Sequence, residues 1–164
     1  MSELLQASAG ALAGKIRRKE ISSRELIEAC LARYEARHRA INAIVDLAAD
    51  EALAAADTAD RAIAQGEETG PLHGVPLTIK SSIDVAGRLC ECGSNFRRGR
   101  RAQKDAALVS RLRRAGAVIL GVTNTPDMLM SYETDNHLHG RTNHPLNQAF
   151  TAGGSSGGEA AAIA

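Results

Sequence analysis

The 164 residues predict an α/β fold in which N-terminal helices precede part of a mixed, largely parallel sheet flanked by helices. Three observations support this class. Apolar residues recur at helical spacing through most of residues 4–65. The run Val75 to Ile79 has the length and the flanking turn residues of a buried strand. A helix pattern at 106–115 and an apolar run at 117–121 follow, which indicates a βαβ unit with parallel strands.

Composition places the chain among ordinary folded proteins. Its content of 44% hydrophobic but only 2% aromatic residues predicts a core of Ala, Leu, Ile and Val, in a single domain spanning 1–164. A net charge of +1 argues against nucleic acid or an anionic membrane as a partner. The first residues lack a basic, apolar leader, and no run approaches the ~18 apolar residues of a membrane span. We therefore expect a cytoplasmic protein.

The N-terminal part, 1–66, is expected to be a helical wrap without chemistry of its own. Ser22 and Glu25 have the spacing of a capping box. After it, Cys30 falls on the apolar face of the predicted helix, which indicates a core position. The short run 41–45 is compatible with a strand, and an alanine-rich helix is predicted at 50–64.

The catalytic α/β part is expected over 70–164, and its first strand ends in Lys80. Burial at such a position lowers the pKa of an amine towards ~7 to 8, where it acts as a general base. A strand-end lysine that extends into solvent is the alternative. His73, just before the strand, is interpreted as a structural histidine bonded to the backbone.

The residues between Lys80 and the second strand are basic, and we interpret the arginines of 97–101 as a solvated loop. In the helix that follows, Leu108, Val109 and Leu112 have core spacing. The strand 117–121 then places Asn124 at the same sheet edge as Lys80. Ligands of open α/β sheets bind at that edge.

Three cysteines give no metal-site spacing, because Cys90 and Cys92 lack a second pair of ligands. We expect reduced thiols, no metal and no cofactor.

The stretch Thr151 to Ala160 holds four glycines around two serines and leads into an alanine-rich helix. A flexible linker is one interpretation of such a composition. A phosphate-binding loop is excluded, because no lysine follows the glycines. The other interpretation is a loop that positions a serine, with Glu159 at the start of the following helix, where its charge suits the helix dipole.

The lysine strand and the G-G-S-S-G-G loop together resemble the amidase signature family. Further segments of the chain are similar to that family in the same order: 20–26, 70–76, 84–87, 115–121 and 123–126. The resemblance covers nearly the whole chain.

The resemblance implies a Ser-cisSer-Lys triad that hydrolyses amide bonds. Lys80 matches the lysine, and Ser155 matches the serine that follows a cis peptide bond, while Ser156 is assigned to loop support. The nucleophilic serine belongs to a D-x-G-G-S type stretch, which does not occur in these 164 residues, so we expect it beyond Ala164.

The family also implies substrate contacts from Leu129, Met130 and Ser131, which border its acyl pocket, whereas Met128 is predicted to lie in the core. Two departures are visible. His144 stands where many members differ, and the usual Lys-Asp-Asn is Lys80-Ser81-Ser82 here. The second departure argues against the tRNA-dependent amidotransferase of A type.

We therefore expect an amidase that hydrolyses the C–N bond of a small-molecule amide to acid plus ammonia or amine. The alternative is a catalytically incomplete, amidase-like fragment or an amidotransferase A-type subunit that acts in an assembly. Its partners would be copies of itself or amidotransferase-type subunits. Apolar strand faces and an open sheet edge predict that the chain alone associates with itself.

Overall fold

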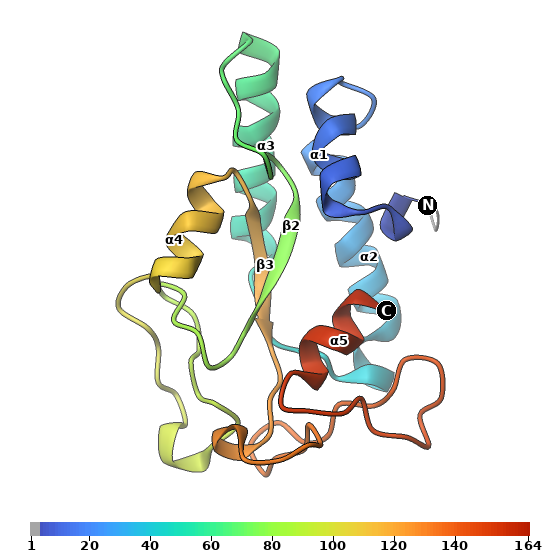
Figure 1. Ribbon diagram of the computed structural model, residues 1–164, viewed down its shortest axis with the longest axis vertical. Coiled ribbons are helices and arrows are strands. Elements are labelled where there is room, and N and C mark those ends of the chain that lie inside the picture. Colours follow the sequence, from blue (N-terminus) through green and yellow to red (C-terminus); the bar gives the residue numbers. More distant parts are fainter. Residues whose placement is uncertain (1–3) are drawn as a thin grey trace. The chain divides into compact units, whose positions relative to one another are not determined.

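A computed structural model describes residues 4–164 and confirms the α/β class (Figure 1). Residues 1–3, where the helical wrap is predicted to begin, lie outside the described part. The elements in chain order are η1 Leu4–Gln6, α1 Ala9–Arg17, α2 Ser23–Ile41, β1 Ile44–Leu47, α3 Ala49–Gln65, β2 Pro76–Lys80, η2 Asn95–Arg97, α4 Ala107–Arg114, β3 Val118–Thr123, η3 Asp127–Leu129 and α5 Gly157–Ile163.

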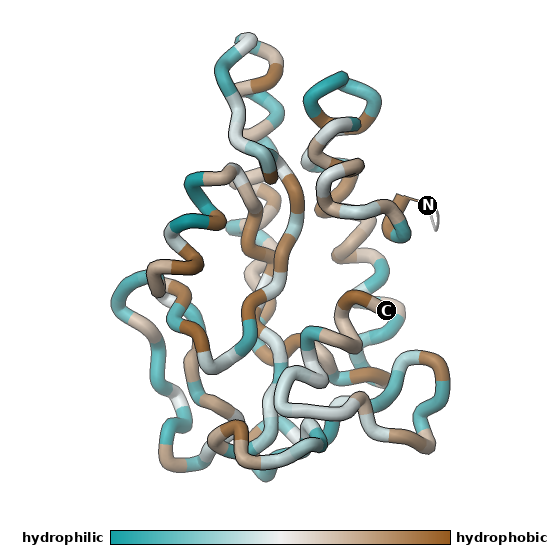
Figure 2. Tube along the Cα trace, viewed as in Figure 1, coloured by the Kyte–Doolittle hydropathy of each residue, from teal (hydrophilic) through white to brown (hydrophobic). Residues whose placement is uncertain are grey.

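The sheet is mixed, with the strand order β1-β3-β2. Strand β1 pairs antiparallel with β3, and β2 lies on the other side of β3. All six residues of β3 are buried, as its central place requires, and Figure 2 shows hydrophobic residues along it. The fold of the sequence prediction is therefore confirmed, and the predicted strand near 41–45 forms slightly later, at β1.

The chain divides into two compact units, of which the first comprises residues up to Tyr34, Ala48–Leu77 and Ser110–Leu120. Its core contains Leu12, Ile16, Leu26 and Val75. The capping box forms as predicted, because the Ser22 N–H donates to Glu25 Oε2 over 2.8 Å and the Glu25 N–H donates to Ser22 Oγ over 3.0 Å.

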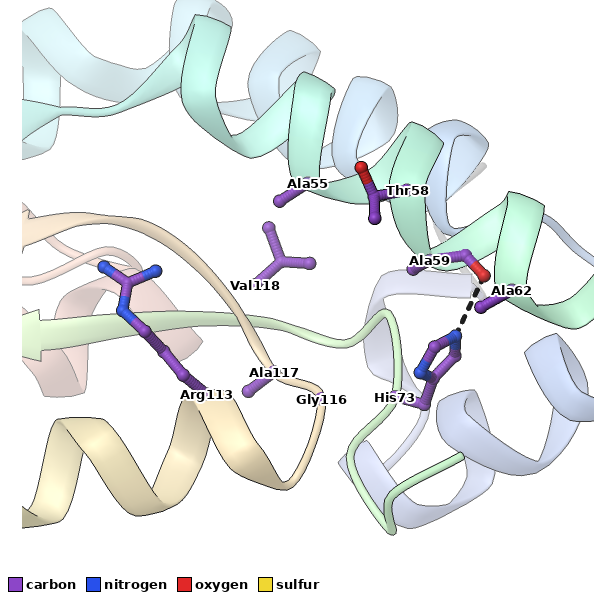
Figure 3. Close-up of a pocket in the computed structure, with 9 residues that line it drawn as sticks. All are labelled: Ala55, Thr58, Ala59, Ala62, His73, Arg113, Gly116, Ala117 and Val118. Atoms are coloured by element: carbon purple, nitrogen blue, oxygen red, sulfur yellow. Dashed lines mark hydrogen bonds between the residues drawn. The ribbon is translucent and has the colours of Figure 1, made fainter. Parts of the chain in front are cut away.

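This first unit also contains a shallow pocket lined mainly by small side chains of α3, such as Ala55 and Ala62, together with Val118 (Figure 3). At its rim His73 donates from Nε2 to the Ala59 carbonyl oxygen over 2.9 Å, which confirms its structural role. None of the predicted site residues lines this pocket.

The second unit comprises Glu35–Leu47, Thr78–Val109 and Gly121–Ala164. Ile41, Ala43 and Ala161 form a small core there. The unit holds the end of β2, the end of β3 and α5, and with them every predicted site residue.

Several side chains lie differently from the prediction. Leu108 and Met128 are 49% and 45% exposed, so the core positions predicted for them are wrong. In the short helix α4 the buried side chain is Val109, and Leu108 is one residue, about 100°, away around the axis. At Met128 the chain turns through a positive φ of 47° within η3, which interrupts helical periodicity. Cys30 is only half-buried.

The arginines of 97–101 are not simply solvated. Arg97 donates to the carbonyl oxygen of Cys90 over 3.1 Å, and Arg100 pairs with Asp84 over 2.7 Å. The hydrogen bond from Arg100 is the main cause that lowers the pKa of Asp84 to about 2. This loop is therefore fixed by its charges. Within residues 4–164, no helix is long and apolar enough to cross a membrane.

Candidate active site

Lys80 is the last residue of β2, and the strand holds it at the sheet edge. Side chains alternate along a strand, so Ile79 turns into the core while Lys80 and Thr78 share the other face. Immediately after Lys80, the Ser81 N–H donates to the carbonyl oxygen of Thr123 over 3.2 Å. This hydrogen bond holds the backbone next to Lys80 against the end of β3.

The serine loop, which we define as Thr151–Ser156, is pressed against the segment 131–134. A Cβ at Gly154 would lie 2.9 Å from the Glu133 backbone nitrogen and 3.0 Å from the Ser131 carbonyl oxygen, so only glycine fits there. The peptide bond from Gly154 to Ser155 is cis, as the family resemblance implies for this serine.

Thr134 holds the serine loop on both sides. Its Oγ1 donates to the carbonyl oxygen of Gly153 over 2.8 Å and accepts from the N–H of Gly157 over 2.9 Å. The Thr134 side chain that makes both bonds is fully buried, and the bond from Gly157 is shielded from water. The loop is therefore a fixed structure that presents its serines, and the flexible-linker interpretation is not supported.

The lysine and the serine loop meet at Nζ of Lys80. This nitrogen donates to Ser155 Oγ over 2.9 Å and to Ser156 Oγ over 2.8 Å. The residues concerned are 75 and 76 positions apart in the sequence. Lys80 therefore points along the sheet edge into the loop, and its amine is anchored rather than free in solvent.

The electrostatics of Lys80 favour the neutral amine only in part. Burial is the largest effect and lowers the pKa of Lys80 below the ordinary value of 10.5, whereas the negative charge of Glu159 raises it. A neutral amine in hydrogen-bond contact with a hydroxyl can accept its proton. The arrangement can thus pass a proton from an incoming hydroxyl through Ser155 to Lys80.

The predicted substrate segment lies beside the serine loop. Ser131 packs through its backbone against Gly154, and its Oγ accepts from the Glu133 N–H over 3.1 Å. Met130 is 87% exposed and Leu129 is half-buried. The structure therefore places this segment against Gly154, the residue before Ser155.

Two groups were not assigned to the site from the sequence. Ser156 contacts Lys80 as closely as Ser155 does. Glu159 accepts hydrogen bonds from Thr78 and Thr123, one on each strand. The position of Ser156 directly after Ser155 could have indicated that Ser156 also belongs to the site. No local sequence pattern connects Glu159 with the two strands.

Comparison with known proteins gives consistent matches. The family model described as Amidase matches residues 25–164. The chain is 42% identical over 165 residues to the A-type subunit of glutamyl-tRNA(Gln) amidotransferase from Mycobacterium bovis (strain BCG / Pasteur 1173P2), and the match covers 100% of this chain and 33% of that relative. The chain thus spans about a third of the length of the curated relatives that it matches.

Two solved structures are also similar. The first is 6-aminohexanoate cyclic dimer hydrolase, with a TM-score of 0.88 and 35% identity over 98% of this chain and 32% of that one. The second is fatty acid amide hydrolase, with a TM-score of 0.90 and 31% identity over 96% of this chain and 28% of that one.

Proposed function

Because the chain belongs to the amidase family, we propose that it supplies the lysine base and the relay serine of an amide hydrolase. The reaction cleaves a carboxylic amide C–N bond with water, to give the acid and ammonia or an amine. The observation that best supports this is the 2.9 Å contact between Lys80 Nζ and Ser155 Oγ.

In the proposed mechanism the nucleophile is a serine from a D-x-G-G-S type stretch beyond Ala164. Its oxygen attacks the amide carbonyl, and its proton passes through the Ser155 hydroxyl to neutral Lys80. The Lys80 ammonium then returns that proton to the leaving nitrogen. Water hydrolyses the resulting acyl ester by the same route, so that the base is restored.

We assign the remaining roles as follows. Leu129, Met130 and Ser131 contact the acyl side of a small-molecule amide, because their segment packs against the serine loop. We also propose that the two compact units belong to one domain over 1–164, with the helical wrap assigned to 1–66 and the start of the catalytic part to 70–164. The protein works in the cytoplasm, without a metal or another cofactor.

The first experiment determines the intact mass of the natural polypeptide that contains this sequence and tests it for ammonia release from simple primary amides. We expect a mass well above 17.3 kDa and measurable hydrolysis. Lys80→Met should lower kcat by ~10² to 10⁴-fold, the usual contribution of a general base. Lys104→Met is the matched control, because Lys104 is exposed, and should leave kcat unchanged.

The serines provide an internal comparison. Ser155→Ala interrupts the proposed relay and should lower kcat nearly as much as Lys80→Met. Ser156→Ala removes one hydrogen bond to the amine, and we expect a loss of only about tenfold. A Lys80→Met protein that still hydrolyses amides at the native rate contradicts the proposed function.

The second candidate is that the protein acts in an assembly, either as an amidotransferase A-type subunit or as a catalytically incomplete, amidase-like fragment. The 42% identity to an A-type subunit of an amidotransferase supports this second candidate. It predicts no hydrolysis by the isolated protein but stoichiometric association with another chain. Co-purification from the native organism, followed by native mass spectrometry, separates this candidate from the independent hydrolase.

A further inference from the structure

We propose that Glu159 is a positioning residue that holds the ends of β2 and β3 and the serine loop together around Lys80. The inference rests on the role proposed above for Lys80. It concerns a carboxylate for which the sequence suggested only a favourable place at the start of a helix.

Both oxygens of the Glu159 carboxylate are occupied by threonine hydroxyls. Oε2 accepts from Thr78 Oγ1 over 2.7 Å, and Oε1 accepts from Thr123 Oγ1 over 2.8 Å. Hydrogen bonds to a charged acceptor are about twice as strong as neutral ones. One side chain therefore connects helix α5 to two neighbouring strands.

The two threonines that bind Glu159 lie close to the backbone that carries Lys80. Thr78 precedes Lys80 by two residues, so both side chains leave the same face of β2. Thr123 is the last residue of β3, and its carbonyl oxygen accepts from the N–H of Ser81. Glu159 thus fixes the strand segment from which the lysine side chain starts.

A glycine brings the helix close enough for these bonds. A Cβ at Gly158 would lie 2.5 Å from both the backbone nitrogen and the backbone oxygen of Asn124, which follows β3. Only glycine permits that approach. Glu159 comes next in the chain, and the serines that contact Lys80 lie four and three residues before it. The carboxylate therefore couples the strands to the serine loop over a short, rigid path.

The charge of Glu159 acts on the amine through space. The hydrogen bonds of Lys80 go to the two serines, while the two threonine hydroxyls hold the carboxylate. A direct ion pair would keep the amine protonated and unable to act as a base. At its observed place the carboxylate opposes the effect of burial on the pKa of Lys80, and Cys92, on the loop after β2, is the other titratable group near the amine.

Titration of Lys80 in the Glu159→Gln variant tests this proposal without requiring turnover. Glutamine keeps the size of the side chain and can accept from one threonine while donating to the other. Competitive labelling with a trace amine-selective acylating reagent, read by peptide mass spectrometry, reports the pKa of each lysine. We expect Lys80 to titrate at lower pH in Glu159→Gln, because the negative charge that favours the ammonium is gone.

Two controls accompany the labelling. Exposed Lys104 should react identically in both proteins, and the variant Glu68→Gln, which removes an exposed carboxylate, should leave Lys80 unchanged. Circular dichroism verifies that each variant is folded. An unchanged Lys80 titration in folded Glu159→Gln overturns the proposed coupling.

The positioning role has a separate kinetic test in the full-length enzyme. Thr78→Val removes one of the two donors, and we expect kcat to fall on the order of tenfold with little change in KM, because the base is misplaced rather than the substrate. Thr78→Ser restores the hydroxyl and should rescue kcat. Equal kcat for the valine and serine variants contradicts the role of Glu159, whereas an active Lys80→Met contradicts the proposed function itself.

Discussion

A lysine must lose its proton before it can accept another, and the surroundings of Lys80 decide how readily that happens. Burial of its amine favours the neutral form, and two hydroxyls hold the amine in place without charging it. The same lysine on an open surface would keep the higher, ordinary pKa of its amine and hold its proton more firmly. The environment of this one side chain therefore turns a common surface residue into a candidate base.

This environment predicts a pH profile. The amine accepts a proton only when neutral, so kcat/KM should rise with pH through the pKa of Lys80 and level off above it. Because that pKa lies below 10.5, the midpoint of the rise should also lie below 10.5. Initial rates of amide hydrolysis in a constant-ionic-strength buffer series measure it. A midpoint at or above the ordinary lysine value contradicts the assignment.

At the scale of elements, helix α5 starts where it does because glycine allows a close approach. Its first residues, Gly157 and Gly158, pack against Thr134 and Asn124, where larger side chains do not fit. The alanine-rich part from Ala160 was expected to look helical, yet the helix already begins at Gly157. Packing outweighs the low helix propensity of glycine here.

A glycine pair tests this interpretation. Gly158→Ala should lower the free energy of unfolding by about 1 to 3 kcal/mol, because the new methyl group overlaps the backbone of Asn124. Gly10→Ala in α1 is the control, since a Cβ there meets nothing within 4 Å and a helical alanine should stabilise the protein by about 0.5 kcal/mol. Urea unfolding followed by circular dichroism measures both. Equal effects of the two substitutions argue against close packing at α5.

At the scale of the whole molecule, the apolar surface of the second unit stands out. Phe96, Tyr132 and Leu146 are 98%, 91% and 85% exposed, and Phe150 and Ile163 are also largely exposed. Single exposed apolar residues are ordinary, but so many large ones in one small unit favour association. The chain has only two phenylalanines, and both lie at the surface.

We therefore expect the 164-residue chain, expressed alone, to associate with itself. Sedimentation velocity at rising protein concentration should show species heavier than the 17.3 kDa monomer. The double variant Leu146→Asp, Phe150→Asp should move the distribution towards monomer, because it places charge on two of the exposed positions. A monomer at every concentration for the unaltered chain contradicts the expectation.

The sequence by itself determined the class of the fold and the order of its elements. Capping, helical periodicity and the apolar runs at β2 and β3 are local properties, and local hydrogen bonding and burial largely fix them. The lysine at a strand end and the two serines among glycines also carried the family resemblance on which the proposed chemistry rests. Those features could therefore be predicted from the sequence alone.

Only the tertiary structure decided which groups meet. The family resemblance implied that Lys80 and Ser155 meet, but the hydrogen bond from Lys80 to Ser156 and the connection of Glu159 to Thr78 and Thr123 appeared only in the structure. All of these contacts join residues that are far apart in the chain. The exposure of Leu108 and Met128 likewise depended on the exact rotation of a short helix and on a positive φ. Such contacts arise from packing between distant segments, and no local pattern encodes them.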